Sequence, residues 1–268
     1  MTTLHFTKMH GLANDYIYVD ARDIPHQPWP ELARRLSRRH TGIGADGLVL
    51  ITRSEVADFG MRIFNADGSE AQMCGNASRC IGKYVYEHGL TDKTTVHLDT
   101  KAGVRELRLH VVDGRVESVT VDMGIPEYMG RAEIPVGGRG IPIDKVSMGN
   151  PHAVCFFASP DNMPVRTLGP QIATHPHFVE GTNVEFVCVK NRRELLMRVW
   201  ERGSGETMAC GTGACAAAVA AIQRGVCSRD VTVHLPGGDL QIRLTDYGHV
   251  EMTGGATEVF TGELRLEI

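Results

Sequence analysis

The sequence has 268 residues, 42% of them hydrophobic and 22% charged, and a formal net charge of −4 at pH 7. These values are typical of a folded protein with one large or two modest domains, and they exclude disordered and fibrous classes. The charge pattern predicts no nucleic-acid partner. No apolar stretch is long enough to cross a bilayer, and the first residues lack the apolar core of a signal peptide, so we expect a cytoplasmic protein without a membrane partner.

In the first half of the chain, β-rich residues predict strands at 16–19, 48–51 and 61–64. A helix is expected at 30–39, where the basic run at 34–40 has helical spacing and is interpreted as a solvated helix face. A second helix is expected at 76–88, followed by strands rich in Val and Thr.

The second half predicts a matching helix at 212–224, which is apolar on all sides and should therefore be buried. The Pro- and Gly-rich segment 134–142 is the expected connector between the halves. The tail 259–268 reads as a final strand that pairs with either half or with a partner.

Two segments, 61–76 and 197–212, resemble each other and place a cysteine at the same point, Cys74 and Cys210, 136 residues apart. Asn14 and Asn150, and Gly47 and Asn183, share this offset, which indicates internal duplication. We therefore predict an α+β fold of two pseudo-symmetric domains, each an antiparallel sheet or barrel wrapped around a central helix. The expected domains are 1–118 with 256–268 and 119–255, with the active site in the cleft between them.

Each of these two cysteines is followed by a glycine at the start of a predicted helix. Unpaired N–H groups and the helix dipole favour a thiolate there and lower its pKa from about 8.5. The same N–H groups can bind a carboxylate. Two such helix starts suit a cofactor-free racemase, in which one thiol removes an α-proton and the other returns a proton from the opposite face.

The remaining cysteines are interpreted as packing residues, which is the usual role of a free cysteine. These are Cys80, Cys155, Cys188, Cys215 and Cys227. An odd number of cysteines without C-x-x-C pairs argues against a disulfide framework or a zinc cluster, so no metal is expected.

The motifs N-A-D-G-S-E-A-Q-M-C-G-N and E-R-G-S-G-E-T-M-A-C-G-T-G-A, with G-N-P-H between them, resemble diaminopimelate epimerase over essentially the whole chain. Proline racemases share the two-cysteine plan but typically have His where this chain has Asn76. The resemblance implies interconversion of LL- and meso-diaminopimelate without pyridoxal phosphate or metal. It also implies a role in lysine and peptidoglycan precursor synthesis, and a homodimer.

On that resemblance Cys74 and Cys210 are the acid/base pair. His152 and Glu201 would tune the thiols or orient the reacting amino group. Positions that would bind the reacting carboxylate are Gly75, Asn76, Gly211 and Thr212, and positions that would contact mainly the distant end of the substrate are Asn14, Asn65, Asn150, Asn183 and Arg202.

Several alternatives stay open. Asn65 and Asn150 also suit turn chemistry, and His152 suits a hydrogen-bonded strand position. Gly47 stands where many members have Gln, and Ala13 and Ala77 stand where Gly is frequent. A racemase for another amino acid, such as histidine, a thiol redox protein and a non-catalytic amino-acid-binding protein are the rival functions.

Overall fold

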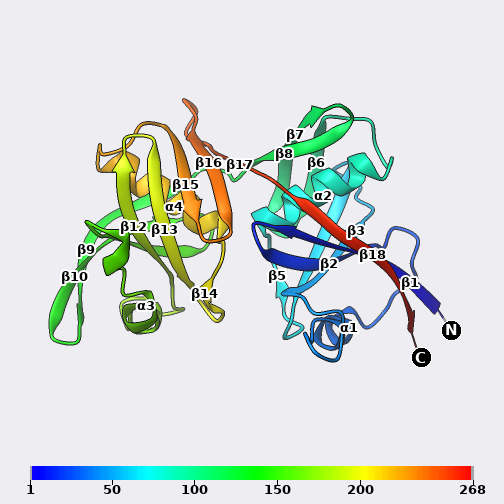
Figure 1. Cartoon of the computed structure of the whole chain (residues 1–268), viewed down its shortest axis with the longest axis horizontal. Coiled ribbons are helices and arrows are strands. Elements are labelled where there is room, and N and C mark those ends of the chain that lie inside the picture. Colours follow the sequence, from blue (N-terminus) through cyan, green and yellow to red (C-terminus); the bar gives the residue numbers. More distant parts are fainter. Residues whose placement is uncertain (1, 267–268) are drawn as a thin grey trace. The chain divides into compact units, whose positions relative to one another are not determined.

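The computed structural model describes residues 2–266 and divides into two compact units. The first comprises Met1–Val121 with Gly254–Ile268, and the second comprises Asp122–Thr253. Figure 1 shows that each unit is a set of strands around one helix, α2 in the first and α4 in the second. The fold is α+β.

The first unit contains two helices and most of the N-terminal strands. In chain order these are β1 (Thr2–Gly11), β2 (Asn14–Asp20), α1 (Trp29–Leu36), β3 (Gly47–Thr52), β4 (Phe59–Asn65), β5 (Glu70–Ala71), α2 (Gly75–Glu87), β6 (Thr95–Thr100), β7 (Gly103–Val112), β8 (Arg115–Asp122) and, from the C-terminal segment, β18 (Thr257–Leu266).

The second unit repeats this order after the initial strand β9. Its elements are β9 (Glu127–Val136), β10 (Arg139–Ser147), β11 (Pro151–Phe156), the 3-10 turn η1 (Pro160–Asn162), α3 (Val165–Ala173), β12 (Asn183–Asn191), β13 (Glu194–Glu201), β14 (Gly205–Thr207), α4 (Gly211–Gln223), β15 (Asp230–Leu235), β16 (Gly238–Leu244) and β17 (Val250–Gly254).

The duplication expected from the sequence is present in the structure. Helices α2 and α4 both begin and end 136 residues apart (211 − 75 and 223 − 87), and β3 and β12 begin 136 residues apart (183 − 47). The strand pairings also repeat, since β3–β4 and β12–β13 are both antiparallel. The two units are therefore pseudo-symmetric copies.

The sheets are mixed, whereas the sequence led us to expect antiparallel ones. β2 pairs with β3 in parallel, and so does β4 with β6, and the second unit repeats both pairings in β11–β12 and β13–β15. The reason is that a helix lies between the paired strands in the chain, and such crossovers bring the next strand back in the same direction.

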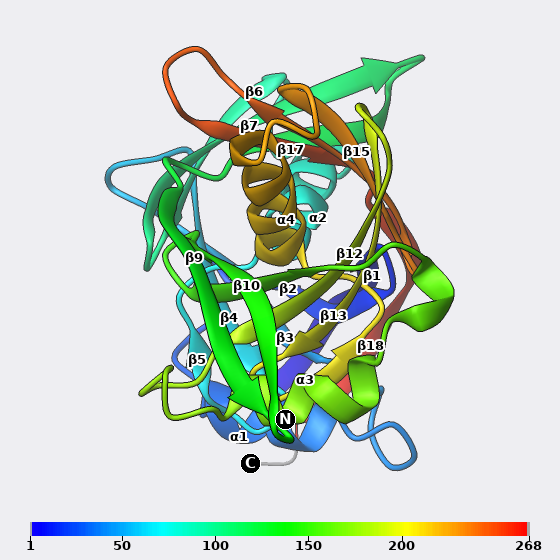
Figure 2. The ribbon, with the colours of Figure 1, turned by 90° about the vertical axis from the view of Figure 1, so that its left-hand side faces the viewer.

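Both central helices are largely buried. In α4 ten residues are buried, most of them alanine, and the helix packs against seven strands of its own unit, β9 to β13, β15 and β16. Figure 2 shows α4 enclosed by these strands. The prediction of a buried second helix is confirmed. Small side chains let the surrounding strands approach the helix axis closely.

Helix α1 is shorter than predicted, because it ends at Leu36 rather than at residue 39. The Leu36 carbonyl accepts hydrogen bonds from the N–H groups of Ile43 and Gly44, which turns the chain back on the helix end. Only Arg34 and Arg35 of the basic run lie in the helix. The interpretation of the whole run as a helix face was wrong.

The segment 134–142 is not a connector between the units. It forms the turn of the β9–β10 hairpin inside the second unit. The expected C-terminal strand is present as β18, which pairs antiparallel with β1 in the first unit. Residues 267 and 268, which the prediction included, lie outside the described residues.

Gly47 begins β3 opposite Asn65 of β4, and it is buried. A Cβ atom at this position would lie 2.2 Å from the Phe64 carbonyl oxygen and 3.0 Å from the Tyr16 ring. The strands therefore approach too closely at this position for a side chain.

We expect Gly47→Ala to lower the free energy of unfolding by about 1–3 kcal/mol, the usual cost of overpacking. Gly255→Ala is the matched control, because a Cβ there would have its nearest neighbour at 3.9 Å. Urea denaturation followed by circular dichroism measures both. Equal stability of the two variants would contradict the close strand contact.

Candidate active site

Both sequence-predicted cysteines occupy the same structural position, directly before the first residue of a central helix. Cys74 precedes α2 with φ −142° and ψ 117°, and Cys210 precedes α4 with φ −132° and ψ 111°. Neither side chain caps its own helix. The N–H groups of each first turn, which have no partner inside the helix, thus point toward the region of the thiol.

In the first unit Cys74 lies in a network of amide side chains. Its Sγ atom is 3.5 Å from Oδ1 of Asn14, and the same oxygen accepts a 3.2 Å hydrogen bond from Nδ2 of Asn76. The structure thus brings together three of the predicted site residues at one helix start, with Gly75 as the first residue of the helix.

Arg79, which the sequence did not single out, lies behind this network. Its side chain is fully buried, and Nη2 donates a 2.9 Å hydrogen bond to Oδ1 of Asn76. Its Nε donates to the Gly255 carbonyl at 3.2 Å. This guanidinium fixes the Asn76 amide and adds a positive charge one turn into α2. The available signal was that Arg79 is the one charged residue among residues 75–82, ahead of Lys83 and Glu87.

In the second unit a longer chain of contacts starts at Cys210. Its Sγ atom lies 3.6 Å from Oγ1 of Thr212, and this oxygen lies 3.4 Å from Nδ2 of Asn150. Oδ1 of Asn150 is 3.0 Å from Nε2 of His152, whose Nδ1 is 2.7 Å from Oε1 of Glu185. Gly211 is the first residue of this helix.

His152 and Glu185 are both fully buried, and burial raises the pKa of the Glu185 carboxyl. A Cβ atom at Gly213 would lie 2.7 Å from Oε1 of Glu185, so the glycine lets the carboxyl approach the helix start. Sequence reasoning missed Glu185, because its position inside a strand gives no sign of what it faces.

Glu201 lies at the end of β13 and receives a 2.5 Å hydrogen bond from Oγ1 of Thr207. Burial raises the pKa of this carboxyl, and the bonds from Thr207 and from the Cys210 thiol act in the opposite direction. Glu201 therefore belongs to the immediate surroundings of Cys210.

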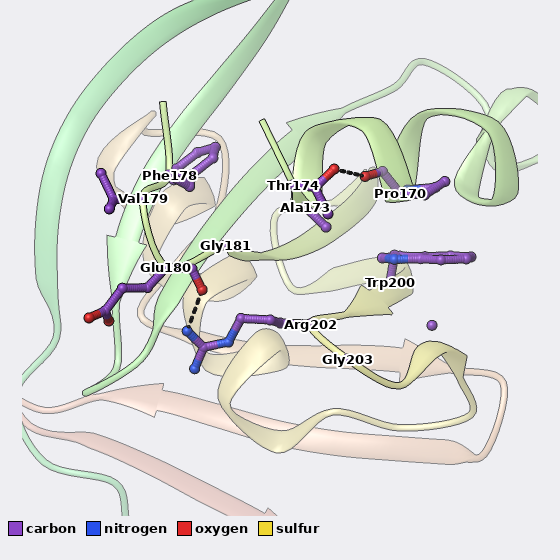
Figure 3. Close-up of a pocket in the computed structure, with 11 residues that line it drawn as sticks. Pro170, Ala173, Thr174, Phe178, Val179, Glu180, Gly181, Trp200, Arg202 and Gly203 are labelled. Carbon is purple, nitrogen blue, oxygen red and sulfur yellow. Dashed lines mark hydrogen bonds between the residues drawn. The ribbon is translucent and has the colours of Figure 1, made fainter. Parts of the chain in front are cut away.

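Asn183 and Arg202 are also brought together. The Arg202 N–H donates to Oδ1 of Asn183 at 2.9 Å, and its Nη1 atom donates to the Glu180 carbonyl at 2.9 Å. Figure 3 shows the guanidinium at the edge of a pocket whose wall includes Trp200 and Phe178. A cation beside apolar and aromatic walls is suited to an anionic group on a short aliphatic chain.

Asn65 is placed in a β-turn and not in either cysteine network. Its Nδ2 atom donates to Oγ of Ser69 at 3.0 Å, within the turn that joins β4 to β5. The side chain carries out the turn chemistry that the sequence left open as an alternative. Ala13, just before β2, has a left-handed φ of 64°, a conformation that glycine adopts more readily than alanine.

The other five cysteines are buried within or beside the expected helices and strands, so their interpretation as packing residues is confirmed. Within residues 2–266, no three His, Cys, Asp or Glu side chains are arranged to hold a metal ion. In the same range no helix has the length and apolar character needed to cross a membrane.

Burial raises the pKa of the Cys210 thiol well above its ordinary value, and the Glu201 and Glu185 carboxyl groups add to the effect. The sequence led us to expect a lowered value from the helix start alone. In this protein the loss of hydration and the two neighbouring acids raise the pKa instead.

We therefore expect Cys210 to react with iodoacetamide only at a pH above the ordinary thiol range. Glu201→Gln should lower the midpoint of the pH profile, because it removes a negative charge beside the thiol, while burial keeps the midpoint above the ordinary value. Glu206→Gln is the matched control, since Glu206 pairs instead with Arg166 and Arg198. Peptide-resolved mass spectrometry measures the labelling rates. A wild-type Cys210 that titrates below the ordinary thiol value would contradict this account.

Comparison with known proteins places these features in a family. The sequence matches the family model described as diaminopimelate epimerase over residues 6–129 and 145–259. It is 53% identical over 278 residues to a diaminopimelate epimerase of Phocaeicola vulgatus, with 99% of each chain covered. It is 49% identical over 277 residues to one of Acetivibrio thermocellus, covering 98% of this chain and 99% of that one.

Among solved structures, a PhzF-family phenazine biosynthesis protein of Bacillus anthracis has a TM-score of 0.80 at 17% identity and covers 99% of this chain and 100% of its own. A hydroxyproline epimerase of Agrobacterium vitis has a TM-score of 0.73 at 17% identity, covering 98% and 92%. These two likenesses show the fold. The match to the family model and the identity of about half to these relatives show that the chain belongs to the diaminopimelate epimerase family.

Proposed function

We propose that the protein interconverts LL- and meso-diaminopimelate without pyridoxal phosphate, by a two-base reaction at Cys74 and Cys210. One observation carries the proposal. The same unusual position, a cysteine directly before the first turn of a buried central helix, occurs twice at the same place in a duplicated fold. Removal and return of a proton are mirror tasks, and two copies of one thiol site suit them.

In this reaction the substrate carboxylate is held by the N–H groups at the helix starts, which begin with Gly75 and Gly211. A thiolate takes the α-proton, so that negative charge moves onto the carboxylate oxygens. The other thiol gives a proton to the opposite face of the same carbon. Preorganised N–H donors stabilise the developing charge, and loss of one such donor typically raises a barrier by about 3–4 kcal/mol.

The protonation states follow from the surroundings of each thiol. Because burial and two acids raise the pKa of Cys210, we infer that Cys210 is the thiol in the substrate-free protein. Each turnover converts the base of the pair into the acid and the acid into the base, so the two thiols exchange their protonation states. Substrate binding expels water and replaces it with the fixed N–H groups. Both protonation arrangements of the two thiols can then form.

Groups that could bind a second amino-acid end favour diaminopimelate as the substrate over a simpler amino acid. Arg202 offers a planar pair of donors for a distant carboxylate, and Asn183 holds its backbone in place. Asn14 and Asn150, which lie in the two cysteine networks, have amide groups that can both donate and accept, as an amino-acid head group requires. Asn65 would bind the substrate only by giving up its hydrogen bond to Ser69. Glu201 and His152, on the Cys210 side, are proposed to orient the reacting amino group and tune the thiol.

We further propose a cytoplasmic protein that supplies precursors of lysine and peptidoglycan and that assembles as a homodimer. These finer points rest on the family. The exposed side chains of Val259 and Phe260 on β18 offer an apolar surface for self-association. Light scattering after size exclusion measures the mass of the assembly.

We expect Cys74→Ala and Cys210→Ala each to reduce turnover of LL-diaminopimelate by 10²–10⁴-fold, on the order of what a positioned acid or base contributes. Cys188→Ala is the control, because its thiol lies buried in β12 and should leave turnover near wild type. Polarimetry or circular dichroism follows the reaction, with histidine and proline as alternative substrates. Turnover of either of these, and none of diaminopimelate, would contradict the substrate assignment.

A further inference from the structure

Asn14 presents one particular end of its amide to the catalytic thiol. Its Oδ1 atom faces Cys74 at 3.5 Å and also accepts the Nδ2 hydrogen bond of Asn76. The two ends of an Asn amide have nearly the same shape, so the end that faces the thiol depends on the partner of the other end.

That partner is Asp46, in the loop between α1 and β3. Its Oδ2 atom accepts a 2.9 Å hydrogen bond from Nδ2 of Asn14 and a 3.2 Å bond from the N–H of Asp15. A carboxylate can only accept. As long as Asp46 is ionised, the amide nitrogen of Asn14 must turn toward it and the oxygen must turn toward Cys74.

Arg39 holds Asp46 in this role from the other side. Its Nη2 atom lies 2.9 Å from Oδ1 of Asp46 and 3.0 Å from Oδ1 of Asp15. The buried Lys8 pairs with the second oxygen of Asp15 at 2.5 Å. Arg39 thus joins two acids that would otherwise repel each other, and Lys8 adds a second cation at Asp15. The hydrogen bonds that reach the Asp46 carboxylate from Asn14, Asp15 and Arg39 are all donated to it.

We propose that Arg39 and Asp46 are positioning residues that lock the Asn14 amide with its oxygen toward Cys74. The oxygen accepts a hydrogen bond from the thiol and so stabilises the protonated form of Cys74. A reversed amide would point its N–H donors at the sulfur and stabilise the thiolate. The network therefore helps to set the balance between the two forms at this thiol. The inference rests on the proposed function only for its effect on turnover.

The second unit has no counterpart of the Asn14–Asp46 hydrogen bond at the position that matches Asp46. The residue 136 positions after Asp46 is Thr182, whose hydroxyl donates to the Asn183 carbonyl. The counterpart of Asn14 is Asn150, and here Nδ2 faces the helix-start residue Thr212 while Oδ1 faces His152. The two asparagines occupy duplicated positions, but Asn14 turns its amide oxygen toward its helix start and Asn150 turns its amide nitrogen there.

Asp46→Asn tests the lock. Arg39 still requires an acceptor, so the new side chain turns its oxygen to Arg39 and its NH₂ group to Asn14. Asn14 then loses the acceptor that holds its nitrogen away from the thiol, and its amide reverses in a fraction of the molecules, against the opposing Asn76 donor. We expect the pH midpoint of Cys74 labelling by iodoacetamide to fall by about 0.5–1 pH unit, the size expected when one hydrogen bond changes from favouring the thiol to favouring the thiolate. Cys210, in the same molecules, should keep its wild-type profile.

Asp15→Asn is the control for charge. It removes one negative charge from the same cluster but leaves the bond between Asn14 and Asp46, so its shift should be less than half as large. A Cys74 midpoint that does not move in Asp46→Asn overturns the proposal, and so does an equal shift in both variants or at both thiols. Labelling needs no turnover. A shifted Cys74 in a protein that does not epimerise diaminopimelate would refute the proposed function and leave the positioning role intact.

Discussion

The structure depends on the placement of each cysteine directly before the first turn of a buried helix. At Cys74 and Cys210 the backbone is extended, and at the next residue it becomes helical. That change of direction leaves the N–H groups of the first turn without partners inside the helix and sets the thiol beside them. The strands around α2 and α4 hold the helices rigidly, so the thiol and the N–H groups keep a fixed relation.

The two copies of this arrangement have kept their helix starts and changed their surroundings. Around Cys74 the neighbours are amides and a cation: Cys74 contacts Asn14, Asn14 contacts Asn76, and Asn76 contacts Arg79. Around Cys210 they are buried acids and a histidine. The shared part suits two opposite proton transfers, and the divergent part gives the two thiols different surroundings, of which those of Cys210 raise its pKa.

Much of this could be predicted from the sequence, because the duplication aligned weak local signals with each other. Both central helices start one residue before their predicted positions, and the cysteine placement followed from the repeat. The predicted order of strand, helix and strand at 16–51 already favours a parallel pair, but which strands lie side by side depends on folding in space. The roles of Arg79, Glu185 and Asp46 were also hidden. Each acts through a contact made by folding, and nothing in its neighbours along the chain indicates that contact.

The central claim is that two different groups remove and return the proton. The most direct measurement is the reaction of LL-diaminopimelate in heavy water, stopped early and analysed by mass spectrometry of the separated isomers. Two bases predict one deuterium at the inverted carbon of the meso product and almost none in the remaining substrate. Early meso product that retains the original hydrogen would show return by a single base and would contradict the account.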